Sequence, residues 1–218
     1  MDWAFIQKYA PMYVQAAGLT LRIGAIGILI AVGVGLICCL ARYYRVPVLN
    51  AVCGGYIELA RNTPLLVQLF FLYFGLPKIG VKISGEACAI AGLAFLGGAY
   101  MAESFRSGLE AVSRAQKEAG ACLGLTQAQN LRYVILPQAL AAAIPAVCAN
   151  VIFLLKETSV FSAVAIADLM YVAKDLIGMY YKTDEALLML VIAYLAILLP
   201  ISWAFSRLER RLRHGGAV

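Results

Sequence analysis

The chain has 218 residues, of which 63% are hydrophobic and only 14% are charged, and its formal net charge is +6. Soluble domains carry roughly a quarter charged residues, and a mean hydropathy of +0.83 would leave too much apolar surface in water. The composition therefore excludes a soluble domain and predicts an integral membrane protein. Cytoplasmic loops and anionic headgroups account for the positive surplus, so no nucleic acid is expected as a partner.

Five apolar segments are long enough to cross the hydrocarbon layer, which needs about 20 residues of helix. They predict an all-α integral membrane protein with five transmembrane helices, forming a single transmembrane domain over residues 1–218. The N-terminus lacks a basic region before its apolar stretch, so the first span is expected to stay in the mature protein. The predicted spans are Leu19 to Ala41, Val52 to Leu76, Ala87 to Leu109, Ala139 to Leu155 and Ala186 to Phe205.

Lys and Arg decide the orientation, because cytoplasmic loops near span ends carry an excess of these residues. The segments that follow spans one, three and five are rich in them, whereas the alternate loops hold only scattered Lys. This alternation predicts an external N-terminus and a cytoplasmic C-terminus. The cytoplasmic set comprises Arg42, Arg45, Arg114, Lys117, Arg132, Arg207, Arg210, Arg211 and Arg213.

Residues that an enzyme would need are missing from the sequence. The only histidine is His214, near the C-terminus, so no histidine-based triad or metal site is expected within the membrane. The chain also has no G-x-x-x-x-G-K-[ST] loop to hold ATP. Six cysteines show no paired metal spacing and are interpreted as small hydrophobic residues. The chain is expected to be catalytically silent and to bind no metal or cofactor.

One cytoplasmic loop, at about residues 110–136, is amphipathic and contains two glycines, Gly120 and Gly124. These glycines predict a short helix, a turn and a second helix. Ala119, Cys122 and Leu123 lie at i, i+3 and i+4, which gives one small apolar face. That face suits either docking into a groove on a soluble partner or a position on the membrane surface, and the pattern alone leaves both open.

The same loop resembles the EAA motif of ABC importer permeases, the segment that meets the ATPase. The resemblance rests on Glu118, Ala119, Gly120 and Gly124, followed by "VILP" at Val134 to Pro137. Gly120 stands where Ala is usual, and Val134 where Ile is usual. Three further stretches are similar to segments of polar amino acid permeases: "ELARNTPLLVQLFF" from Glu58, "AYMAESFRSGLEAV" from Ala99 and "LLKETSVFSAVAIADL" from Leu154.

This resemblance implies the permease subunit of an ATP-driven importer of polar amino acids, with type I ABC importer permease architecture, in the bacterial cytoplasmic (inner) membrane. The implied partners are two copies of an ABC ATPase, which binds ATP and Mg, a second permease copy or a homologous permease, and an extracytoplasmic amino-acid-binding protein. Within the loop, Glu118, Gly120 and Gly124 would shape the backbone, while Ala119, Cys122 and Leu123 would dock on the ATPase. An ion-coupled secondary carrier is the alternative, but it predicts inverted repeats that the two halves do not show.

Ionisable groups at membrane depth are costly and normally face the bundle interior or a water-filled path. Asn150 and Glu157 are seven residues apart, so both are expected to face one substrate cavity. Glu157 could bind an ammonium group and Asn150 a carboxylate or carboxamide. Alternatively, Lys156 and Glu157 form a structural ion pair at the helix end.

Two further polar groups are candidates. Glu58, Arg61 and Asn62 precede Pro64, which is expected to break the helix and leave backbone groups free to line a cavity. Arg61 could hold a carboxylate, or else anchor the segment at the headgroups with Glu58 beside it. Glu103 and Arg106 are three residues apart and are interpreted as an intracellular gate or a helix staple. Asp168, Lys174 and Asp175 are placed in an outer loop, either solvated or meeting the binding protein.

Overall fold

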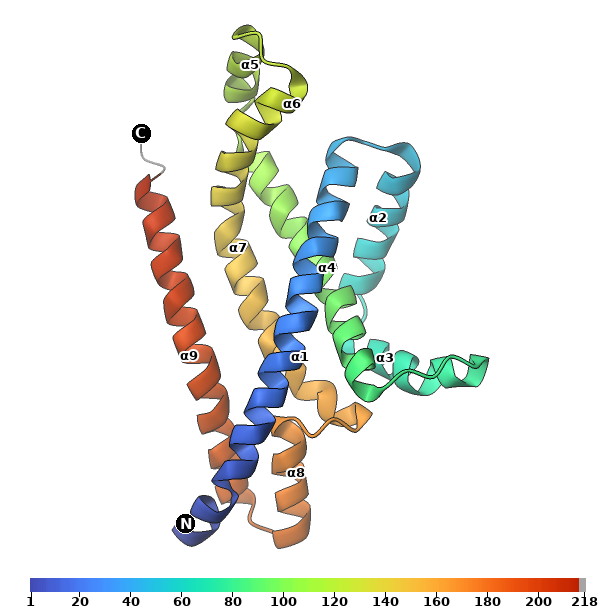
Figure 1. The fold of residues 1–218 in the computed structure, drawn as a ribbon, viewed down its shortest axis with the longest axis vertical. Helices are drawn as coiled ribbons and strands as arrows, with labels where there is room; N and C mark the ends of the chain where they lie inside the picture. Colours follow the sequence, from blue (N-terminus) through green and yellow to red (C-terminus); the bar gives the residue numbers. More distant parts are fainter. Residues whose placement is uncertain (216–218) are drawn as a thin grey trace.

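The computed structural model describes residues 1–215, apart from the side chains of residue 117 and residues 212–215. Arg213 and His214 therefore lie outside the described side chains. The described chain is an elongated assembly of helices, with the N-terminus at one end and the C-terminus near the other (Figure 1). Its long helices are α1 (Trp3–Tyr43), α4 (Gly85–Ala111), α7 (Leu136–Glu157) and α9 (Thr183–Gly215).

In the described chain, four helices are long and apolar enough to cross a membrane, and a bent pair makes a fifth span. The predicted all-helical class is thus confirmed. The second span is broken: the chain bends by 104° between α2 (Pro47–Arg61) and the segment Leu65–Ile79. That segment comprises α3 (Leu65–Phe70), a π-helical turn (Phe71–Gly75) and a 3₁₀ turn (Leu76–Ile79). The prediction of one straight span from Val52 to Leu76 was therefore wrong. Pro64 redirects the chain, as expected because proline disfavours helix at the residue before it.

The first span is also longer than predicted, since α1 begins at Trp3 rather than near Leu19. The added turns bury Tyr9, Tyr13 and Ala16 against α8 (Leu169–Tyr180) and the start of α9. These contacts form a separate apolar core at the outer end of the molecule, below α3 in Figure 1. Hydropathy missed these turns because protein contacts, rather than lipid, stabilise them.

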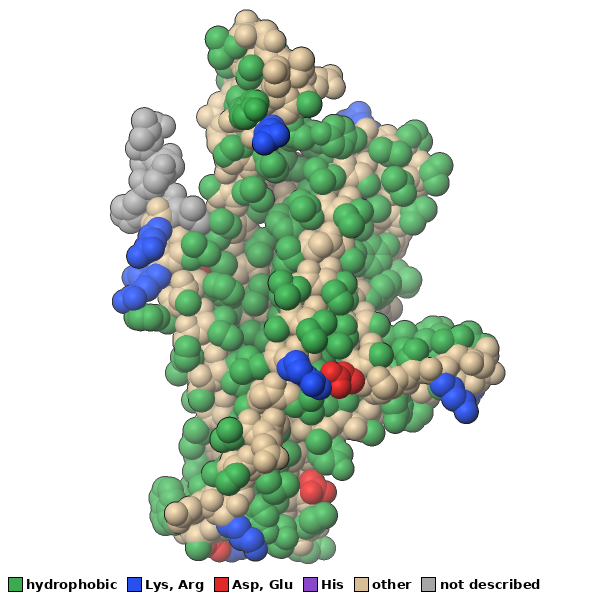
Figure 2. Space-filling model, in the orientation of Figure 1, with side chains coloured by type: hydrophobic (Ala, Val, Ile, Leu, Met, Phe, Trp, Pro, Cys, Tyr) green, Lys and Arg blue, Asp and Glu red, His purple; other side chains and the backbone are tan. Residues whose placement is uncertain are grey.

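The cytoplasmic end carries α5 (Arg114–Cys122) and α6 (Gln127–Asn130), which project beyond α1 and α4 (Figure 1). A π-helical turn (Leu131–Ile135) joins α6 to α7, so the fourth span forms one helical rod over Gln127–Val164. The predicted span, Ala139 to Leu155, is the part of this rod with continuous apolar sequence. Hydrophobic side chains cover most of the visible flank, and few Lys or Arg interrupt them (Figure 2).

Glycines allow α4 to approach its neighbours closely in the centre of the bundle. A Cβ on Gly35 of α1 would lie 2.5 Å from the Met101 side chain. A Cβ on Gly108 of α4 would overlap the carbonyl oxygen of Ala139 on α7. Because such contacts leave no room for a side chain, these two glycines set the spacing of α1, α4 and α7.

Asp168 does not lie in a solvated loop, which corrects the sequence interpretation. It is fully buried, and its Oδ1 accepts a hydrogen bond from the Tyr171 N–H at 2.9 Å as the N-cap of α8. Burial raises the pKa of Asp168 to about 6. Between about pH 4, the usual range of an unfolded Asp, and pH 6, the folded state holds a proton that the unfolded chain has released. The free energy of unfolding is therefore expected to fall as the pH rises through this window.

Asp168→Asn should keep the cap, since Asn and Asp are equally good at this position, and should remove the titration. Wild type is expected to lose on the order of 1 kcal/mol of stability between pH 5 and pH 7, and the variant much less, in thermal unfolding of the purified complex. Asp2→Asn is the matched control: Asp2 caps α1, and the Phe5 N–H and Lys182 lower the pKa of its carboxylate. Asp2 is expected to titrate below about pH 4. The Asp2→Asn variant should therefore show the same loss of stability between pH 5 and pH 7 as wild type. A flat wild-type profile would contradict the prediction.

Candidate functional site

A polar cavity of about 520 Å³ opens where the break between α2 and α3 faces α4 and α7. Its walls combine charged, amide and hydroxyl groups with apolar side chains, as small-molecule sites commonly do. The polar lining is Arg61, Asn62, Thr63, Tyr100 and Glu157, and the apolar lining is Pro64, Leu65, Leu66, Leu96, Phe153 and Val160. We call this space the central cavity.

Two groups of opposite charge face the central cavity from different helices. Arg61 ends α2, lies 3.9 Å from the Glu103 carboxylate and stacks 5.4 Å from the centre of the Tyr100 ring. Glu157 ends α7, and within the described residues no cation lies within ion-pair distance of it. The cavity therefore offers a guanidinium to an anion and a carboxylate to a cation.

The break that positions Arg61 is stabilised by Gln68, which the sequence analysis missed. Gln68 Nε2 donates to the carbonyl oxygens of Ala60 and Thr63, both at 3.1 Å, and to Thr63 Oγ1 at 2.9 Å. These bonds satisfy backbone groups that the proline leaves without helical partners. A signal was present, since Gln68 is a polar residue in an apolar run, one helical turn after Pro64.

Asn62 and Glu58 interact with each other at the end of α2. The Asn62 amide donates to the Glu58 backbone carbonyl at 2.8 Å and to its carboxylate at 3.2 Å. Asn62 lines the central cavity, whereas Glu58 lies one turn away and is not part of the lining. The anion nearest Arg61 is Glu103 rather than Glu58.

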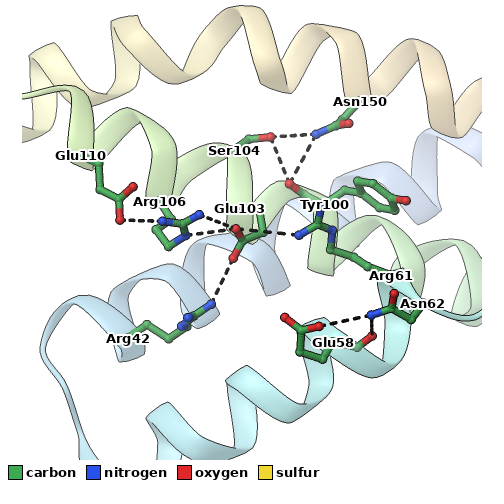
Figure 3. Close-up of polar contacts among 10 residues, drawn as sticks. All are labelled: Arg42, Glu58, Arg61, Asn62, Tyr100, Glu103, Ser104, Arg106, Glu110 and Asn150. Carbon is green, nitrogen blue, oxygen red and sulfur yellow. Dashed lines mark hydrogen bonds and ion pairs between the residues drawn. The ribbon is translucent and has the colours of Figure 1, made fainter.

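Asn150 does not share the cavity with Glu157, contrary to the prediction from their spacing. Its amide donates to Ser104 Oγ at 2.8 Å and to the Tyr100 carbonyl at 3.4 Å (Figure 3). At the level of Asn150, α7 therefore packs directly on α4. Helical periodicity could not say which neighbouring helix covers Asn150.

Lys156 is exposed and lies outside the cavity lining. Within the described side chains it does not approach Glu157 within ion-pair distance. Consecutive residues of a helix point in different directions, which is why the structural ion pair does not form.

Glu103 joins three helices through arginines (Figure 3). Its carboxylate accepts from Arg42 of α1 at 3.1 Å and from Arg106 of α4 at 2.7 Å, besides its contact with Arg61 of α2. Arg106 also donates to Glu110 at 2.6 Å. The arrangement goes beyond a staple within one helix, because it ties the cavity residue Arg61 to the cytoplasmic ends of α1 and α4.

The loop that resembles the EAA motif presents its apolar face to solvent. Leu123 is 81% exposed, and Ala119, Cys122 and Glu118 are also exposed. Gly124 has φ +78°, the left-handed conformation that ends α5 and turns the chain. The predicted helix, turn and helix is confirmed, with the turn at Gly124.

Gly120 has a different role from the one predicted. It lies inside α5 and is buried, and a Cβ there would overlap the side-chain amide of Asn130. Gly120 is therefore a point of close packing between α5 and α6 rather than a turn residue. Sequence alone gave no sign of this contact across the turn.

Gly120→Ala is expected to loosen this packing, although Ala favours helix, because overpacking costs about 1–3 kcal/mol. The rate of limited proteolysis between α5 and α6 should rise, since it reports local opening. Asn130→Ala makes room for the methyl group, so Gly120→Ala should cost less in the Asn130→Ala background than in wild type. Equal costs in the two backgrounds would show that the Asn130 contact is not the cause.

The family described as "Binding-protein-dependent transport system inner membrane component" matches residues 24–214. The chain is 32% identical over 214 residues to the "Glutamine transport system permease protein GlnP" of Escherichia coli (strain K12), covering 97% of this chain and 98% of the relative. It is 32% identical over 219 residues to the "L-cystine transport system permease protein TcyL" of Bacillus subtilis (strain 168), covering 97% and 92%. A "Crystal structure of an amino acid ABC transporter with histidines" superposes with a TM-score of 0.91 at 34% identity, covering 97% and 99%.

These matches span nearly the whole chain and agree with the helical architecture. They remove the ion-coupled secondary carrier as an alternative, because members of this family work with a separate ATPase subunit and with a solute-binding protein. ATP hydrolysis takes place in that ATPase and not in this chain. The chain belongs to the binding-protein-dependent transport system inner membrane components, the permease subunits of ABC transporters in the bacterial inner membrane.

Proposed function

We propose that this chain forms the membrane path for polar amino acids, and that the central cavity is where the substrate rests during transport. The observation that carries the proposal is the pair Arg61 and Glu157, which line one cavity from different helices. An amino acid carries one carboxylate and one ammonium group at neutral pH. A cavity with one guanidinium and one carboxylate matches both charges.

Each part of such a substrate has a counterpart in the cavity. The planar guanidinium of Arg61 suits the α-carboxylate, with the Asn62 amide beside it. Glu157 suits the ammonium group. Tyr100 and Phe153, whose ring centres lie 5.1 Å apart, offer an apolar wall, and the Tyr100 hydroxyl offers a polar contact for the side chain. Polar neutral or cationic amino acids fit this arrangement best, since Arg61 already has Glu103 nearby and Glu157 has no such partner.

Known relatives support this substrate class without fixing one amino acid. The names of the full-length relatives mention glutamine and L-cystine, and the solved structure with the TM-score of 0.91 is described with histidines. These molecules share the ammonium and carboxylate groups and differ in the side chain. The shared groups are those that Arg61 and Glu157 would bind.

A second permease copy, or a homologous permease, is proposed to complete the path. The broken second span exposes the apolar side chains of Val67, Phe71 and Phe74 beside the cavity, and five spans of ordinary length enclose little space alone. Two permeases would then present two coupling loops to two ATPase copies, which bind ATP and Mg. Leu123, Cys122 and Ala119 would dock on those subunits.

Reconstitution with the ATPase and binding protein of the same system tests the proposal. Proteoliposomes loaded with ATP would be offered labelled polar, cationic, acidic and apolar amino acids through the binding protein. We expect ATP-dependent uptake of a polar neutral or cationic amino acid, with hydrolysis stimulated by the loaded binding protein. Uptake of a substrate that lacks either the ammonium or the carboxylate group, at the same rate as an amino acid, would contradict it.

A further inference from the structure

A second polar pocket lies at the cytoplasmic ends of α1, α2 and α4, separate from the central cavity. Its volume is about 580 Å³. Three arginines and one glutamate line it, so its wall carries net positive charge. The polar lining is Arg42, Tyr43, Arg45, Asn50, Arg106 and Glu110. We call it the basic pocket.

Arg45 is the residue that marks the basic pocket as a binding site. Its side chain is exposed, and within the described residues it makes no hydrogen bond or ion pair. Its φ is +50°, a left-handed conformation that glycine normally occupies at a helix end. An unpaired guanidinium is thus held at a position that would suit glycine better.

The other two arginines are fixed in place by neighbours. Arg42 donates from Nη1 to Glu103, which leaves its Nε and Nη2 without hydrogen bonds among the described residues. Arg106 is held by Glu103 and Glu110, as Figure 3 shows. Preorganised donors of this kind bind an anion with little further loss of side-chain entropy.

The basic pocket adjoins a shallow apolar crevice of only about 20 Å³. Cys39 and Leu109 belong to the lining of both. Beyond them the crevice is lined by leucines of α1 and α7, including the exposed Leu36 and Leu140. Tyr43 lines the pocket, and both it and Tyr44 are exposed, as aromatic residues are at the membrane interface.

From this arrangement we propose that the basic pocket binds the phosphate of an anionic phospholipid from the cytoplasmic leaflet, with an acyl chain lying over the exposed leucines beside the crevice. Basic pockets between membrane helices on the cytoplasmic side suit such headgroups. A free phosphate could use the arginines but would gain nothing from the crevice, so the lipid is the better match. The site does not depend on which solute the permease carries.

Native mass spectrometry of the permease–ATPase complex tests this proposal directly. The complex would be offered phosphatidylglycerol or phosphatidylcholine with identical acyl chains. Wild type should retain phosphatidylglycerol in preference, and Arg45→Gln should lower that retention about five-fold, the equivalent of about 1 kcal/mol for one Arg near an anionic surface. Glu110→Gln removes the only carboxylate of the lining and should raise retention.

Two further variants separate the site from general charge and from folding. Arg207→Gln removes one exposed arginine at the cytoplasmic end of α9, outside the basic pocket, and should leave retention unchanged. Arg45→Gly suits the left-handed backbone, so it should fold as well as wild type and still lose the lipid. The proposal is overturned if Arg45→Gln and Arg207→Gln reduce retention equally, or if wild type shows no preference. Displacement of the lipid by millimolar inorganic phosphate would instead identify a free-phosphate site.

Discussion

Leu123→Asp should uncouple the permease from its ATPase while leaving the membrane fold intact. Leu123 is 81% exposed at the tip of the cytoplasmic extension, so the fold loses little when it changes. A leucine anchor that docks in a partner groove contributes about 2 kcal/mol or more, and a carboxylate there would be buried without a partner. The affinity of the permease for the ATPase subunit is therefore expected to fall about 30-fold or more, since 1.4 kcal/mol corresponds to a factor of ten.

Gln127→Asp is the matched control for Leu123→Asp. It places the same charge on the same extension, at the first residue of α6, where an acidic group is favourable. The ATPase affinity and the hydrolysis stimulated by the binding protein should survive in this variant and be lost in Leu123→Asp. Equal behaviour of the two variants would mean that the apolar face of α5 is not the docking surface.

A continuous stretch of helix connects this loop to the central cavity, and we expect it to transmit the coupling. From α6 to Glu157 the chain runs as one helical rod of about 31 residues, or about 45 Å at 1.5 Å per residue. Gly124 turns the chain just before the rod begins, and Glu157 lies in the cavity lining at the other end of α7. In the proposed function, a displacement of the docked loop would reach Glu157 along this rod, which contains a π-helical turn (Leu131–Ile135) and Pro145. Glu103 connects the cavity residue Arg61 to Arg42 of α1 and to Arg106 of α4.

The sequence predicted those features of the fold that depend on whether a segment is surrounded by lipid or by water. Apolar length gave the spans, the distribution of Lys and Arg gave the topology, and Pro64 gave the break. It failed where protein replaces lipid as the neighbour, as at Tyr9 and Tyr13, which extend α1 against α8.

The same limit explains which candidate site residues were predicted correctly and which were not. Arg61, Asn62 and Glu157 come together in one cavity. Asn150 is committed to Ser104 instead, and Gln68 was missed although it stabilises the break. Helical periodicity gives the direction of a side chain along its own helix. It does not give the neighbouring helix, and the neighbour decides whether a polar group lines a cavity or closes a contact.

Glu157→Gln should reduce uptake much more than it reduces hydrolysis by the ATPase. In the proposed function, Glu157 accepts the substrate ammonium group, and hydrogen bonds to charged groups contribute about 1.5–3 kcal/mol. Loss of such a contact corresponds to a fall of about ten-fold to a hundred-fold in binding at the cavity. The docking loop is unchanged, so hydrolysis stimulated by the binding protein should persist while the amount of amino acid carried per ATP falls.

Two comparisons distinguish a substrate contact from a structural role of Glu157. Glu86→Gln removes a carboxylate of the same size from the outer end of α4, outside the central cavity, and should transport normally. Arg61→Gln should reproduce the uncoupled phenotype, because it removes the proposed partner of the substrate carboxylate from the same cavity. If Glu157→Gln lowers the thermal stability of the complex and leaves the uptake per ATP unchanged, Glu157 serves the fold alone. If Arg61→Gln transports normally while Glu157→Gln does not, the cavity recognises a cation rather than both ends of an amino acid.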